Sequence, residues 1–274
     1  MEYVEFLRVR RVFTIFAASV AVIAILAIAT IVYSSVGTTG KDTYVGFSIG
    51  DKLPTESHKL SSYLQALPIP LGLLVAIASY VAIAVATVFA SSLNKENDGL
   101  DFVFVKPIRR EIIAMRYFAT DIVGILAIFA FTIATELITL ALTHLFQRIS
   151  IDARAFWFGG LGLGVAFMWY GILQAVTATY KGKGGAIVAL SWAIFGGLTG
   201  AGSLTMLGPI YLGIVRTLNF ANPLAYLSSL VSNGSTYNVG SVLGGPLEAH
   251  ACIVWVIALG AMAIAAVSWK RVEA

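Results

Sequence analysis

Charged residues are scarce in this sequence. Only 12% of its 274 residues are Asp, Glu, Lys or Arg, whereas soluble domains carry about 25%. Hydrophobic residues make up 58% of the chain, and they are gathered into runs long enough to cross the roughly 30 Å hydrocarbon core of a bilayer. This composition excludes an ordinary soluble enzyme and predicts an integral membrane protein.

Residues that build disulfides, metal sites and nucleotide sites are also rare or scattered. Cys252 is the single cysteine, so the chain forms no internal disulfide. The histidines His58, His144 and His250 are far apart and form no H-E-x-x-H pattern, so no metal site is predicted. The sequence also lacks a phosphate-binding loop of the form G-x-x-x-x-G-K-S/T. We therefore expect neither a cofactor nor an ATPase site within this chain.

Six stretches are apolar and long enough for transmembrane helices, which need roughly 20 residues each. They cover residues about 12–33, 68–93, 118–145, 155–179, 184–207 and 251–269. The first run is too long for a cleaved signal peptide, whose apolar region has about 7 to 15 residues, so we expect it to be retained. The predicted fold is an all-α integral membrane protein in which residues 1–274 form a single transmembrane domain.

The Lys and Arg residues predict the orientation, because basic residues near spans stay preferentially in the cytoplasm. If the N-terminus is inside, twelve of the 18 Lys and Arg residues lie on the cytoplasmic side. We therefore predict that both termini are cytoplasmic and that the protein is a multi-pass component of the cell (plasma) membrane. The same bias explains the net charge of +4, and nucleic acid is not predicted as a partner.

Three segments outside the spans differ from plain connections. Residues 1–11 carry acidic and basic residues at three-residue spacing among apolar ones, which favours an N-terminal interfacial helix. Residues 207–250 are predicted to lie outside and combine prolines and glycines with apolar stretches, so we expect a re-entrant segment. Residues 94–117 form an inner loop between the second and third spans.

The inner loop contains a short apolar core among charged residues. This core consists of Leu100, Phe102, Val103, Phe104 and Val105. A short amphipathic helix that ends at Pro107 and is followed by Arg109 and Arg110 would present an apolar surface with charged flanks to a cytosolic partner. A membrane-surface helix without a partner needs the same composition, and this alternative stays open.

Several residues of this loop resemble the permease subunits of ABC-2 type ATP-binding cassette transporters. They are Glu96, Gly99, Leu100, Phe102, Pro107, Arg109 and Arg110, followed by Ile112 and Ile113, which lead into the third span. Six spans with both termini inside, a basic N-terminal helix and an Asn-Pro pair at residue 222 agree with the same family. The resemblance implies that the loop is a cytoplasmic coupling helix that docks into an ATPase. Leu100, Phe104 and Pro107 would form the contact, and Arg109 and Arg110 would steer the partner.

The same resemblance implies the partners of the chain. Two cytosolic ABC ATPase subunits would bind ATP and Mg and supply the energy, and a second permease copy or a homologue would complete the complex in the lipid bilayer. The chain itself would be a transport subunit rather than an enzyme, and the resemblance favours export, with a homodimer of permeases.

The third span carries a polar stripe. At about 100° per residue, one face collects Asp121, Thr132, Glu136, Thr139 and Thr143. Ionisable groups at membrane depth are costly, which indicates a function, and we predict that this stripe lines a translocation path. The alternative is structural: Asp121 lies near the inner interface, and a protonated Glu136 is hydrogen-bonded to threonines in a packed bundle.

Two other functions stay open. An ion-coupled secondary carrier or channel would use Asp121 and Glu136 without an ATPase. A purely structural membrane-anchoring subunit would recruit partners and would not need the stripe. The substrate is not predicted, because no binding motif separates lipids, glycans, peptides and drugs.

Overall fold

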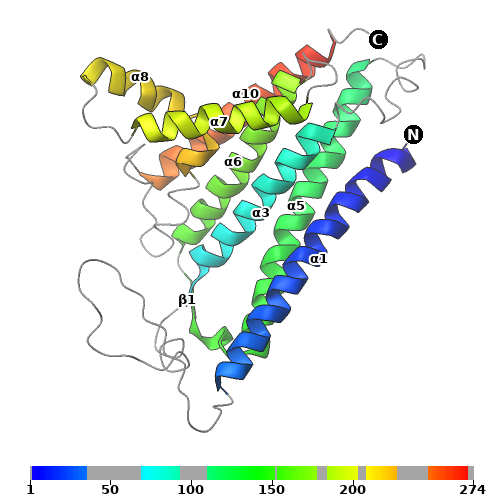
Figure 1. The fold of residues 1–274 in the computed structure, drawn as a ribbon, viewed down its shortest axis with the longest axis vertical. Coiled ribbons are helices and arrows are strands. Elements are labelled where there is room, and N and C mark those ends of the chain that lie inside the picture. Colours follow the sequence, from blue (N-terminus) through cyan, green and yellow to red (C-terminus); the bar gives the residue numbers. More distant parts are fainter. Residues whose placement is uncertain are drawn as a thin grey trace.

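The computed structural model of the protein describes most of its helical core (Figure 1). The described residues are 2–35, 69–92, 110–151, 153–177, 184–202, 208–226 and 246–270. Nearly all of them are helical, which confirms the all-α prediction for this part of the chain.

The long helices follow one another along the chain with few other elements between them. They are α1 (Glu2–Ser35), α3 (Leu71–Ser92), α5 (Arg110–Leu142), α6 (Arg154–Thr177), α7 (Gly184–Gly202), α8 (Pro209–Asn219) and α10 (Leu247–Lys270). The short strands β1 (Ile69–Pro70) and β2 (Ile149–Ser150) pair in parallel, and the 3-10 helix η1 (Phe146–Arg148) precedes β2. This small pairing fixes the start of α3 beside the chain that follows α5.

Five of the described helices are long and apolar enough to span a membrane. The apolar stretches are Phe6–Thr30, Leu71–Ser91, Met115–Leu142, Arg154–Thr177 and Leu247–Ser268. Each coincides with one of the predicted spans, so the prediction of a helical membrane protein is supported at these five places. The particular membrane and the side on which the termini lie stay predictions.

The sixth predicted span, residues 184–207, corresponds to α7. Its apolar stretch, Gly185–Ala201, is shorter than the other five. Figure 1 shows α7 running across the bundle rather than alongside it. Glycines are frequent at both ends of α7, and glycine costs about 1 kcal/mol relative to alanine in a helix, which favours a short helix here.

Helix α6 forms the centre of the core. It packs between α3 and α10, and α5 adds a further layer on the other side of α3, with α1 packed against α5. Two glycines of α6 allow these close contacts: a Cβ on Gly162 would lie 1.9 Å from Ser79 Oγ, and one on Gly171 would lie 3.0 Å from Ala261 Cβ. The buried side chains of α6 include Phe158, Trp169 and Tyr170.

The N-terminal residues do not form a separate interfacial helix. Helix α1 is continuous from Glu2 to Ser35, so the expected helix over residues 1–11 is the first part of the first span instead. The physical reason lies in Arg8, whose side chain is only 15% exposed and turns into the bundle. Figure 1 shows the start of α1 and the end of α10 at the same end of the bundle.

Candidate functional site

The candidate site is built around Asp121 in α5. This residue lies six positions into the apolar stretch that begins at Met115, roughly 9 Å along the helix at 1.5 Å per residue. Its side chain is fully buried. An ionised carboxylate at such depth is costly unless it is paired and hydrogen-bonded, so its partners decide what it does.

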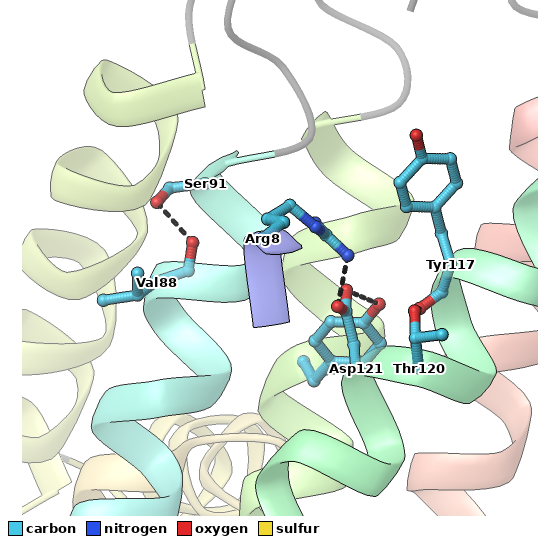
Figure 2. A network of polar contacts seen from close by, with 7 residues as sticks. Arg8, Val88, Ser91, Tyr117, Thr120 and Asp121 are labelled. Carbon is cyan, nitrogen blue, oxygen red and sulfur yellow. Dashed lines mark hydrogen bonds and ion pairs between the residues drawn. The ribbon is translucent and has the colours of Figure 1, made fainter. Parts of the chain in front are cut away.

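Asp121 is bound by residues from two other helices. The guanidinium of Arg8 in α1 forms an ion pair with Asp121 Oδ1. From α6, the hydroxyl of Tyr170 donates a hydrogen bond of 2.7 Å to Oδ2. Figure 2 shows the side chain of Arg8 directed at Asp121, with dashed lines for these contacts. Both carboxylate oxygens are therefore occupied.

Aromatic rings enclose the charged head of Arg8. Its Cζ lies 5.0 Å from the ring centroid of Tyr117 in α5 and 5.7 Å from that of Phe89 in α3. A cation within about 6 Å of an aromatic face is stabilised, more so where water is excluded. Four helices, α1, α3, α5 and α6, thus contribute to one polar contact, which we call the junction: Arg8, Phe89, Tyr117, Asp121 and Tyr170.

Gly124 makes the junction sterically possible. It lies one turn beyond Asp121, and a Cβ at this position would lie 2.8 Å from Phe89 Cε2 and 3.0 Å from Val9 Cγ1. The absence of a side chain lets α1 and α3 approach α5 at the level where the ion pair forms.

The rest of the predicted stripe behaves differently from Asp121. Thr132 is buried, whereas Glu136, Thr139 and Thr143 are half-buried. Each threonine hydroxyl donates to a carbonyl of its own chain: Thr132 to Ile128, Thr139 to Thr135, and Thr143 to Thr139, all at 2.8 Å. The threonines are therefore satisfied without Glu136.

Glu136 has no hydrogen-bond partner in the part of the chain that the structure describes. Both of its carboxyl oxygens are nevertheless shielded from solvent. The structural alternative, in which the threonines hydrogen-bond to Glu136, does not hold among the described residues. Whether the stripe lines a translocation path stays a prediction.

Most of the predicted coupling residues lie outside the described residues. These are Glu96, Gly99, Leu100, Phe102, Phe104, Pro107 and Arg109. Arg110 is the first residue of α5. The end of α3 and the start of α5, which flank this segment, lie at the same end of the bundle as the start of α1 (Figure 1).

A second polar cluster joins α7 to the chain after α8. Asn222 Nδ2 lies 2.9 Å from Phe195 O, 2.9 Å from Thr199 Oγ1 and 2.7 Å from Asn219 Oδ1. Asn219 Nδ2 donates to Leu198 O at 3.2 Å. The Asn-Pro pair at residue 222 is thus a buried clasp within the predicted re-entrant segment.

Aromatic side chains hold the same turn against α10. Phe220 stacks on His250 at 5.5 Å between ring centroids, and the hydroxyl of Tyr226 donates to Phe220 O at 3.2 Å. Burial raises the pKa of the Tyr226 phenol above its ordinary value, so the hydroxyl keeps its proton and remains a donor. This cluster is a structural anchor, and the described side chains provide no chemistry for catalysis there.

The described residues contain no group of three or more His, Cys, Asp or Glu side chains that is suited to a metal ion. No protein family, curated protein or solved structure matches this chain. The functional argument therefore depends on the residues themselves.

Sequence reasoning missed two members of the junction, Arg8 and Tyr170. Arg8 was interpreted as part of the positive charge beside the first span, and Tyr170 as one aromatic residue among many. The signal that was available is Asp121 itself, because a carboxylate at this depth requires a cationic or hydroxyl partner. Nothing in the sequence, however, distinguishes Arg8 from Arg10 or Arg11 as that partner.

Proposed function

We propose that this chain is the transmembrane permease subunit of an ABC-2 type transporter. It would export a substrate across the cell membrane with energy from two cytosolic ATPase subunits, and it would pair with a second permease copy. The resemblance of residues 96–110 to the coupling segment of that family is the origin of the proposal.

The junction is the structural observation that supports it. Residues 93–109 connect α3 to α5, and the first ion pair beyond them in α5 is the one between Asp121 and Arg8. A push on this connection would move the end of α3 and the start of α5 together. Because the junction ties these helices to α1 and α6, the movement would pass to four helices as one rigid body.

The junction also weakens the case for an ion-coupled carrier. A proton or cation relay needs a carboxyl group that is free to exchange its partner. Asp121 is held by Arg8 and Tyr170 instead. Of the two acidic residues that such a carrier would use, only Glu136 lacks a partner among the described residues.

The proposal is tested by purifying the tagged chain from its native membrane in mild detergent. We expect a nucleotide-binding subunit with ATPase activity to co-purify, and we expect Phe104→Asp to abolish this association. Phe146→Asp is the matched control, because Phe146 is 52% exposed in η1, at the opposite end of the bundle. Equal recovery of an ATPase with Phe104→Asp, or recovery of none with the wild type, would contradict the proposal.

A further inference from the structure

Helix α5 carries two acidic residues that differ in one respect. Asp121 and Glu136 each lie about six residues, or roughly 9 Å, from an end of the apolar stretch Met115–Leu142. Asp121 has a cation and a hydroxyl bound to its oxygens. The oxygens of Glu136 are equally shielded from solvent but have no partner in the described chain.

An unpaired carboxylate at membrane depth is destabilising, and burying a polar group without compensation costs several kcal/mol by order of magnitude. The natural compensation is a positive charge, as Arg8 provides for Asp121. We propose that Glu136 is a binding site for the positively charged group of a lipophilic organic cation. The inference rests on the proposed function, because it names the class of substrate that the permease would recognise.

The chemistry of the surroundings favours an organic cation over a metal ion. Metal ions require several oxygen, nitrogen or sulfur ligands, and the described residues offer no cluster of three His, Cys, Asp or Glu side chains. A monovalent organic cation needs one carboxylate and apolar walls. On the same face of α5, one turn from Glu136 in either direction, lie Thr132 and Leu140, and both are buried.

The neighbouring hydroxyls add acceptors but no competing charge. Thr132 and Thr139 donate to backbone carbonyls, so their oxygens keep lone pairs that can accept a hydrogen bond from an ammonium group. No second acidic side chain of the described α5 lies nearer to Glu136 than Asp121. One carboxylate with two hydroxyls matches a single positive charge.

The position of Glu136 leaves two sources for that charge. It lies near the end of the span opposite the junction, within reach of a dissolved cation or of the amine of a lipid headgroup. Both present the same chemistry, a positively charged group attached to an apolar body. The experiment must distinguish them.

The test measures binding of tetraphenylphosphonium to the full chain, purified with any associated subunit, by titration calorimetry. We expect saturable binding to the wild type and at least a tenfold weaker affinity for Glu136→Gln, which corresponds to about 1.4 kcal/mol. Tetraphenylborate, which has nearly the same shape and the opposite charge, should not compete. Glu248→Gln is the matched control, because it removes one acidic residue from the first turn of α10.

Folding is controlled by circular dichroism and thermal unfolding, and Glu136→Gln keeps the size of the side chain. No saturable binding to the wild type, or equal affinity of Glu136→Gln and wild type, would overturn the inference. Repeating the titration in bilayer discs separates the two sources. Weaker binding in phosphatidylethanolamine than in phosphatidylglycerol discs supports the lipid amine, and equal binding supports a dissolved cation.

The outcome is independent of the ATPase test. Binding that depends on Glu136 in a chain without an ATPase partner would leave the site intact and remove the proposed function. A co-purifying ATPase without cation binding would do the opposite.

Discussion

Breaking the ion pair between Arg8 and Asp121 should destabilise the protein severely. Removing one partner of a buried ion pair leaves an uncompensated charge and costs about 3–5 kcal/mol. Arg8→Gln leaves the fully buried Asp121 without its cation, so we expect a loss near the upper end of this range. Asp121→Asn leaves Arg8, whose side chain is 15% exposed and can turn toward the nearby membrane interface, so its cost should be nearer the lower end.

Replacing both partners distinguishes a buried charge from a general loss of packing. The double variant Arg8→Met with Asp121→Leu has no unpaired charge, and exchanges of this kind are often neutral or stabilising. We therefore expect it to be more stable than either Arg8→Gln or Asp121→Asn. The non-additive result is the signature of a directly interacting pair.

The free energy of unfolding is measured by titrating a denaturing detergent into mixed micelles and following tryptophan fluorescence. Arg216→Gln is the control, because Arg216 is exposed on α8 and should change the stability by less than about 0.5 kcal/mol. If Arg8→Gln and Asp121→Asn both behave like this control, or if the double variant loses the sum of the two costs, the junction does not have the role described.

Three further substitutions test the remaining contacts, each by the same unfolding measurement. Tyr170→Phe removes the hydroxyl that donates to Asp121 at 2.7 Å, and a hydrogen bond to a charged group contributes about 1.5–3 kcal/mol. No change would mean that Asp121 does not need it. Gly162→Ala should cost about 1–3 kcal/mol, because its Cβ would lie 1.9 Å from Ser79 Oγ. Gly160→Ala has nothing within 4 Å and should be neutral or slightly stabilising; equal effects at the two glycines would contradict the observed packing of α3 on α6. Asn222→Ala removes the contacts that tie the turn to α7 and leaves buried carbonyls unsatisfied, at about 1–3 kcal/mol, and an unchanged midpoint would show that the clasp does not hold α7.

Hydropathy and length alone predict much of this fold. Five runs of roughly 20 apolar residues must become helices in a bilayer, because lipid cannot satisfy exposed backbone groups. The same criterion was less informative for residues 184–207. Their composition allows a span, but α7 is shorter and crosses the bundle, where Trp192 and Phe195 pack on Trp169 of α6. Such packing is not encoded in hydropathy.

The candidate site was predicted in part for a related reason. A carboxylate at membrane depth is conspicuous in a sequence, so Asp121 and Glu136 could be singled out by cost alone. Their contrasting situations could not, because the answer depends on which side chains lie opposite. The cation for Asp121 comes from a residue more than a hundred positions away in the chain.

The sequence by itself determined that this chain is a helical membrane protein, and which of its side chains are expensive to bury. These properties follow from local composition, since each apolar run meets the bilayer independently of the others. The tertiary structure decided that Arg8 rather than Arg10 or Arg11 neutralises Asp121, and that Gly162 is a contact whereas Gly160 is open. Identical residue types differ here because pairing and close approach depend on helix rotation and register, which only the packed bundle defines.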